Sequence, residues 1–282
     1  MLTTPEAIVG RTNWNVALSL GFKKVGDVTV LASRRHDGPL VVQKPLYPEG
    51  RAVCHVAIIH APGGIAGGDR LGLDIDLAPS AHVLMTTPAA TRWYKAAGRE
   101  ARQTSEIRVA DGAVLEWLPQ ETIVFDQAEA RIATEVQLGD GAVYAGWEIT
   151  CLGRRASGEI FESGRLRQRL EIRRGDRLIW TERLNLRAGD RLLRSAIGLA
   201  GRHVSGTMVV AAGPMSAALL EACRAEIPAD GEGAVTALPD VTVARYLGGS
   251  AEHAKSYFES LRRVLRPWYA GRPAQRPRLW DT

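Results

Sequence analysis

Two Gly-Gly pairs lie close together in the stretch His60-Ala-Pro-Gly-Gly-Ile-Ala-Gly-Gly-Asp-Arg70. An apolar run of β type, residues 52–59, precedes this stretch. After it, apolar residues alternate with polar ones through residue 77, which is the period of a half-buried strand. Glycine tolerates positive φ and close approach of another backbone. The sequence therefore predicts an unusually shaped loop between two strands, with at least two glycines at positive φ among Gly63, Gly64, Gly67 and Gly68.

A glycine-rich loop also invites a phosphate-binding interpretation. That interpretation requires the loop to open a helix, whose N-terminal N–H groups hold the anion. Here a strand pattern follows, and no Gly-Lys-Ser/Thr appears. The sequence therefore disfavours a phosphate site.

Period-two alternation recurs through most of the chain and predicts strands as far as residue 212, among them one over residues 25–32 and one over 158–173. Three segments starting at Leu77, Val109 and Leu138 share one shape, an apolar residue, a tight turn, an alanine and a new β run. Asp-Gly between apolar runs is a hairpin signal. The near-regular spacing of the three segments instead suggests strands stacked in layers. Both interpretations stay open at this point.

The period changes after Gly213. Residues 214–227 predict a helix with Pro214 in its first turn, and Ser250 is placed to cap a second helix whose apolar residues recur at helical spacing. The tail after Pro273 is predicted to be extended. We therefore expect a mainly β protein, a stacked arrangement of many short strands with two helices near the C-terminus. It forms a single domain over residues 1–282, β-rich in 13–212 and helix-containing in 213–282.

Composition excludes several classes of protein. The net charge of +5 comes from 36 basic and 31 acidic residues, and no face or helix concentrates it as nucleic-acid binders do. An arginine-rich segment, 165–177, is interpreted either as the solvated face of a strand or as a surface for an acidic protein partner. Three scattered cysteines form no disulfide framework. Without a signal segment or a run of roughly 18 to 20 apolar residues, we expect a cytoplasmic protein that binds neither membrane nor nucleic acid.

Motifs of catalysis are absent. The sequence lacks the Gly-x-Ser-x-Gly, His-Glu-x-x-His and Cys-x-x-Cys patterns. Cys54 and His55 are adjacent in a predicted strand and point to opposite faces, so they cannot share one metal ion without a bulge. His60, at the start of the glycine loop, is a candidate ligand.

Carboxylates on strands are more informative. Glu182 shares a predicted strand face with Trp180 and Leu184, where a carboxylate is costly unless it is paired, hydrated or coordinated to a cation. Glu148 shares its face with small and polar residues that suit a hydrated interior. Asp69 closes the glycine loop. Each of the three is alternatively a structural hydrogen-bonding group.

Five motifs in order resemble the urease accessory protein D family, known as UreD or UreH, and the resemblance runs from near residue 13 to the end of the chain. The first motif is the glycine loop itself. The others are Leu77–Thr91, the run Leu-Glu-Trp-Leu-Pro-Gln-Glu-Thr at 115–122, Trp147-Glu148 with Leu152-Gly-Arg154, and the tail Pro-Arg-Leu-Trp-Asp-Thr at 277–282.

The resemblance implies a chaperone-like maturation factor and not an enzyme. Such a protein binds the urease apoprotein and accessory proteins F and G. It holds no tight cofactor but helps to deliver nickel, as transient Ni(II), through an internal water-filled passage. The nickel path would then comprise His60, Asp69, Glu148 and Glu182, lined further by Thr86, Thr87 and Thr91.

A conduit must bind an ion well enough to admit it and weakly enough to release it. Isolated oxygen ligands suit Ni(II) transit because imidazole and thiolate hold this ion more tightly. Two alternatives remain, a scaffold that links the F partner to urease without carrying an ion, and a metal-independent hydrolase or transferase built on the glycine loop. Leu279 and Trp280, bulky residues near a chain end, are expected to dock on the body of the protein or on the F partner.

Overall fold

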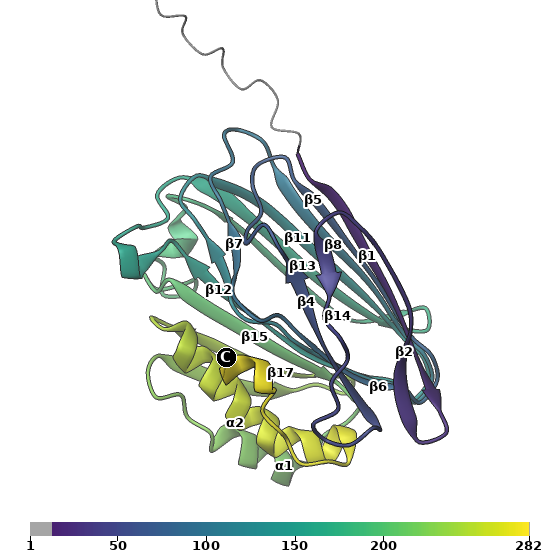
Figure 1. Ribbon diagram of the computed structural model, residues 1–282. Helices are drawn as coiled ribbons and strands as arrows, with labels where there is room; N and C mark the ends of the chain where they lie inside the picture. The colour runs from purple at the N-terminus through teal and green to yellow at the C-terminus, as the bar shows by residue number, and fades with distance from the viewer. Residues whose placement is uncertain (1–12, 282) are drawn as a thin grey trace, which may run out of the picture.

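Two β-sheets lie face to face in the computed structural model, which describes residues 13–281, and two helices cover the outer face of one sheet (Figure 1). The first sheet has seven strands. In spatial order they are β14 (Arg177–Arg187), β13 (Gly164–Arg174), β11 (Ala128–Leu138), β8 (Ala101–Val109), β5 (Arg70–Leu77), β1 (Asn15–Val25) and β2 (Val28–Asp37).

The second sheet has ten strands. Eight follow one path, in the order β16 (Glu232–Ala237), β17 (Thr242–Gly248), β15 (Val204–Ala211), β12 (Val143–Leu152), β9 (Val114–Leu118), β6 (His82–Thr86), β4 (Val53–His60) and β3 (Leu40–Val42). The remaining two lie off this path, β10 (Thr122–Val124) beside β12, and β7 (Thr91–Trp93) beside β10.

The middle of the chain alternates between the sheets from β4 to β13. Strands β5, β8, β11 and β13 pair in parallel in the first sheet, and β4, β6, β9 and β12 do so in the second. Each pair of strands is therefore one turn of a solenoid-like stack. The prediction of a mainly β protein with stacked strands is confirmed.

The three repeated segments mark the corners of this stack. They connect β5 to β6, β8 to β9 and β11 to β12, each time from one sheet to the other. Ser80, Gly112 and Gly141 have φ of 59°, 63° and 63° at equivalent places. The hairpin interpretation of Asp-Gly was wrong here, because the same positive-φ turn can redirect the chain between layers.

Several predicted boundaries were wrong for local reasons. The predicted strand 25–32 is broken by a turn at Gly26, φ 57°, and β2 continues to Asp37. The predicted strand 158–173 begins only at Gly164, after a 3₁₀ turn, Arg155–Ser157. A second 3₁₀ turn, Arg191–Leu193, follows β14.

Helix α1 (Ala217–Arg224) is shorter than predicted, because Ser216 and not Pro214 begins it: the Ser216 side chain accepts a hydrogen bond from the Leu219 N–H. Ser250 caps α2 (Ala251–Ala270) as predicted. The end of the tail, Arg278–Asp281, is not extended as predicted but forms a 3₁₀ turn.

Two apolar cores hold the layers together. One lies between the sheets and contains side chains such as Leu18, Ile75 and Val83. The other lies between the ten-stranded sheet and the helices, and includes Trp147 and Phe258. The strands that separate these cores are buried on both faces, which explains the apolar runs of β4 and β6. Neither helix has the length and apolar composition that a membrane span requires within residues 13–281.

Candidate functional site: two adjoining cavities

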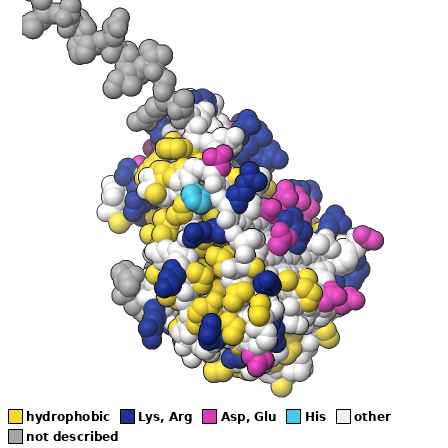
Figure 2. All heavy atoms as spheres, turned by 45° about the vertical axis from the view of Figure 1, so that its right-hand side comes forward, with side chains coloured by type: hydrophobic (Ala, Val, Ile, Leu, Met, Phe, Trp, Pro, Cys, Tyr) yellow, Lys and Arg dark blue, Asp and Glu magenta, His cyan; other side chains and the backbone are white. Residues whose placement is uncertain are grey.

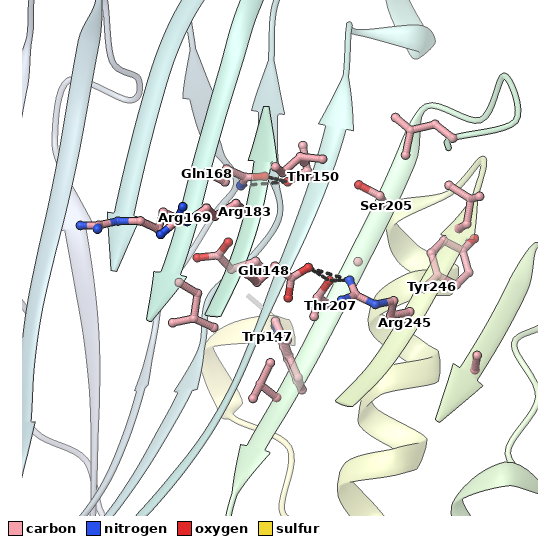
Figure 3. A pocket seen from close by; sticks show the side chains of 18 of the residues that line it. Trp147, Glu148, Thr150, Gln168, Arg169, Arg183, Ser205, Thr207, Arg245 and Tyr246 are labelled. Atoms are coloured by element: carbon pink, nitrogen blue, oxygen red, sulfur yellow. Dashed lines mark hydrogen bonds and ion pairs between the residues drawn. The ribbon is translucent and has the colours of Figure 1, made fainter. Parts of the chain in front are cut away.

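Two cavities adjoin inside the molecule. The larger, of about 630 Å³, lies where β12, β15 and β17 face β13 and β14 (Figure 3). The smaller, of about 260 Å³, lies beneath the glycine loop. Glu148 and Gln168 line both. These two side chains therefore lie where the two cavities adjoin.

Strand register places the polar side chains of the larger cavity in a row. Glu148 on β12 is opposite Thr207 on β15, and Thr207 is opposite Arg245 on β17. Directly opposed residues share a face of the sheet, and in Figure 3 these three side chains follow one another across it. The row faces the seven-stranded sheet.

Glu182 reaches this row from the opposite sheet. The Thr207 hydroxyl donates a hydrogen bond to Glu182 Oε1 at 3.0 Å, and Arg245 Nη1 donates to the same oxygen at 2.6 Å. The predicted strand face is confirmed by the burial pattern of β14, in which Glu182 lies on the less exposed side with Leu184 and Leu186, while Arg183 is exposed on the other side. Glu182 Oε2 is buried and has no hydrogen-bond partner among the described residues.

The two carboxyl groups influence each other. Burial and the neighbouring charge of Glu182 raise the pKa of Glu148 to about 7. Glu148 accepts no hydrogen bond from any residue in the described range 13–281, and the surface it exposes faces the cavities. Its side chain is therefore available to water or a cation, and changes its charge near neutral pH.

Imidazole and hydroxyl groups line the smaller cavity. His60, Thr87 and Thr91 all contribute to its wall. Burial lowers the pKa of His60, and the charge of Asp69 only partly offsets this effect. His60 Nε2 is buried without a hydrogen-bond partner among the described residues. The environment of His60 thus favours the neutral imidazole, and one of its nitrogens has no partner within the described part of the chain.

Two glycines of the loop adopt the left-handed region, as predicted. Gly63 has φ 76° and Gly68 has φ 94°. Strand β5 starts directly after the loop at Arg70. No helix follows, so the loop does not have the geometry of a helix-borne phosphate site.

The other two glycines are required by close packing. A Cβ on Gly64 would overlap the ring of Tyr94, and one on Gly67 would overlap the carbonyl group of Ala96. The loop therefore sits tightly on the segment after β7. It forms a rigid wall of the smaller cavity, which Gly63 and Gly64 line.

Asp69 lies apart from this carboxylate pair. Its two oxygens accept backbone N–H groups of Trp14, at 2.9 Å, and Ala66, at 2.7 Å, and it is 3% exposed. It lines neither cavity. The structure gives Asp69 the role of fixing the glycine loop to the start of β1.

Thr86 also lies away from the two cavities. Its hydroxyl donates to the Leu118 carbonyl at 2.6 Å and accepts the indole N–H of Trp280 at 2.8 Å. The Trp280 ring lies 5.6 Å from that of Trp147, with the Lys255 ammonium 4.2 Å from its centre. The tail is thus docked on the body of the protein, one of the two outcomes expected for Trp280 and Leu279.

Sequence reasoning missed Thr207, Gln168 and Arg245, because pairing across two sheets brings them to the cavity. It also missed a second charge cluster on the far face of the ten-stranded sheet, where Glu116 meets Arg262 and Arg266 of α2. A signal existed, since Glu116 is a carboxylate inside an apolar run and the two arginines lie four residues apart on the apolar face of their helix.

Comparison with known proteins identifies the family. The family model described as UreD urease accessory protein matches residues 15–281. The chain belongs to this family. A urease accessory protein UreD of Methylobacillus flagellatus is 50% identical over 282 residues, which cover 100% of this chain and 99% of that protein. UreD proteins of Azoarcus and Pseudomonas aeruginosa are 52% and 48% identical, each over 95% of this chain and 94% and 95% of their own length.

Membership implies a role in the maturation of urease. The relatives are named accessory proteins and not enzymes, which fits the absence of catalytic motifs from the sequence. Among the described residues, no group of three or more His, Cys, Asp and Glu side chains is arranged to hold a metal ion. The Glu148–Glu182 pair lines the larger cavity, and Glu148 with His60 lines the smaller one.

Proposed function

We propose that this protein is a urease maturation factor that binds apo-urease with accessory proteins F and G and assists nickel delivery through its internal passage. The observation that carries the proposal is the junction at Glu148, which belongs to both cavities. A cation entering from either side meets the same carboxyl group. A carboxyl group shared by both cavities is what a route from one cavity to the other would require.

The ligands along this route suit transit. Glu148 and Glu182 offer oxygen atoms, and His60 offers one neutral imidazole nitrogen. Two oxygen ligands and one distant nitrogen hold Ni(II) less tightly than a cluster of imidazoles or thiolates. The three cysteines are buried, and burial raises the pKa of each thiol to about 11 or 12. They are therefore poor competitors for the ion.

Protein partners have a suitable surface to bind. Figure 2 shows hydrophobic side chains gathered in a band with Lys and Arg side chains along it, while Asp and Glu side chains concentrate to one side. Contiguous apolar surface rimmed by polar groups is typical of protein–protein contact. The scaffold alternative shares this surface but assigns no role to the cavities. The hydrolase alternative has less support, because His60 Nε2 at the glycine loop is hydrogen-bonded to no nucleophile among the described residues.

The test exchanges one carboxylate in the passage. Glu182→Gln keeps the size of the side chain but removes its charge, and Glu135→Gln is the matched control on the exposed face of β11. Each variant is co-expressed with a urease operon that lacks its own D protein. We expect Glu182→Gln to assemble with its partners yet give urease with several-fold less nickel and activity, while Glu135→Gln behaves as the wild type. Full nickel loading by Glu182→Gln would favour the scaffold.

A further inference from the structure

Arg245 stands at the mouth of the larger cavity. Its side chain is 52% exposed, whereas the Glu182 side chain behind it is 21% exposed. Arg245 Nη1 donates to Glu182 Oε1 at 2.6 Å and to the Thr207 hydroxyl at 3.0 Å. The guanidinium group is thus between solvent and the carboxylate, with open space on its outer side.

The ion pair is one-sided. A single guanidinium nitrogen contacts a single oxygen of Glu182, and Glu182 Oε2 is left without a hydrogen-bond partner among the described residues. Arg177 and Asp240 elsewhere on the surface form the two-sided arrangement, with two nitrogens at 2.6 and 2.7 Å from the two oxygens. Two-sided pairs are the stronger and more rigid. Arg245 is therefore held loosely enough to leave.

The other charged side chains around the cavity form ion pairs outside it or lie at its edge. Arg169 is paired with Glu135 and Glu171 on the outer face, and Arg183 also approaches Glu171. Glu232 lines the rim from β16 and is exposed. Within the described residues, Arg245 is the one cation that contacts a carboxylate of the passage.

We propose that Arg245 is the built-in counter-ion of the passage, which occupies Glu182 when the passage is empty and competes with the divalent cation for it. The proposal rests on the proposed function, since it assumes that a cation reaches Glu182. An entering cation displaces the guanidinium group toward solvent. When the ion moves on, Arg245 returns to Glu182 and prevents the ion from binding there again.

Competition of this kind weakens binding without removing any ligand. Two carboxylates that face one cavity would hold a dication well if nothing else neutralised them. A guanidinium group on one of them must be displaced first, and it repels the ion while it stays near. Because the pair is half exposed, we expect the penalty on affinity to be about fivefold to tenfold and not larger.

The experiment titrates Ni(II) into the purified full-length chain by calorimetry. Arg245→Gln should bind Ni(II) about fivefold to tenfold more tightly than the wild type. Arg245→Lys, which keeps a cation at the mouth, should stay near the wild type. Arg177→Gln removes the cation of the unrelated surface pair and should leave the affinity unchanged.

The same substitution made in the Glu182→Gln variant shows whether the gain in Ni(II) affinity depends on Glu182. In Glu182→Gln the carboxylate for which Arg245 competes is gone, so adding Arg245→Gln should give no further gain. Equal affinity of Arg245→Gln and wild type, binding undetectable in both, or a gain that persists with Glu182→Gln, overturns the proposal. Thermal unfolding of each variant checks that all are folded, which the exposed position of Arg245 favours.

Failure of this inference is distinguishable from failure of the proposed function. If Glu182→Gln lowers the nickel content of urease but Arg245→Gln binds Ni(II) no better, the passage stands and the counter-ion role is wrong. If Glu182→Gln delivers nickel normally, the passage itself is wrong, whatever the affinities. Arg245→Gln should also deliver less nickel in co-expression, because it releases the ion more slowly.

Discussion

Glu116 and Glu148 lie near each other on the ten-stranded sheet but on opposite faces, and their carboxyl groups behave in opposite ways. Glu116 on β9 points toward helix α2, and Glu148 on β12 points toward the cavities. Burial alone would raise the pKa of both groups. It does raise that of Glu148 to about 7, whereas the charge of Arg262, the His82 hydrogen bond and Arg266 hold that of Glu116 well below its usual range.

The difference lies in the partners and not in the burial. Glu116 is fully buried and accepts hydrogen bonds from Arg262, Arg266 and Tyr269, with His82 Nε2 at 2.9 Å. The same arginines donate to the carbonyl groups of residues 273 and 275 and so fasten the tail. Both oxygens of Glu116 therefore accept hydrogen bonds from within the fold. Glu148 has no such partner among the described residues, and its side chain faces the two cavities.

The largest expected effect on stability comes from a substitution in the buried cluster of Glu116, Arg262 and Arg266, here called the dry cluster. Glu116→Gln leaves Arg262 and Arg266 buried with a neutral partner, although Arg266 keeps Glu49. Removing one partner of a buried ion pair typically costs about 3 to 5 kcal/mol, and urea unfolding should show a loss of this size in the free energy of unfolding.

Asp240→Asn is the matched control, since it breaks the exposed pair with Arg177. It should cost about 1 kcal/mol or less. A loss from Glu116→Gln no larger than that of the control would show that the cluster is hydrated and that the contrast with Glu148 does not exist.

The second substitution, Glu148→Gln, should raise the free energy of unfolding and not lower it, by an amount that depends on pH. Because the pKa of Glu148 is about 7 in the folded state and the ordinary pKa of a glutamate side chain is 4.5, the folded protein keeps a proton between these values that the unfolded chain has lost. Stability therefore falls as pH rises from 4.5 to 7. Glu148→Gln removes this penalty and should stabilise the protein at pH 8 by up to about 3 kcal/mol, with no gain at pH 4.5.

Urea unfolding at the two pH values, with a chelator present to exclude metal ions, measures the difference. Glu135→Gln, on an exposed strand face, controls for the substitution itself and should show no pH-dependent gain. A gain of equal size at both pH values would mean that Glu148 stays charged, and the cavity would then hold a permanent anion and not a switchable one.

The sequence could predict Glu182 but not its partners. Period-two alternation places Glu182 on the inner face of β14, because one side of that strand faces the interior and the other is solvated. Asp69 gave a similar signal, yet its oxygens are used by backbone N–H groups of the loop and of Trp14. Local pattern reports which side a carboxylate faces. It does not report which donors tertiary pairing brings there.

The stacked arrangement of strands also could not be predicted from local sequence pattern alone. The spacing of the three corner segments was visible, but the turn residues Asp-Gly fit a hairpin as well as a corner. Only the register of parallel strands in two sheets decides between them. The helix α2 was better predicted, since its cap at Ser250 and its apolar spacing act within one segment. Burial of its two arginines required Glu116, which is 146 residues from Arg262 and 150 from Arg266 along the chain.

The smallest expected effect is the difference in stability between two variants, each of which lacks a hydroxyl group that donates a hydrogen bond to Glu116 or Glu182. The Tyr269 hydroxyl donates to Glu116 Oε2 at 3.0 Å in the dry cluster, and the Thr207 hydroxyl donates to Glu182 Oε1 at 3.0 Å in the cavity. Tyr269→Phe leaves the lost bond unreplaced and should cost about 1.5 to 3 kcal/mol, the usual value for a bond to a charged group. Thr207→Val should cost less than about 1 kcal/mol, because a cavity of this size admits water that replaces the hydroxyl. Urea unfolding of the two variants side by side measures the difference. Equal losses would mean that the cavity is as dry as the cluster, and a passage without water would not carry a hydrated cation.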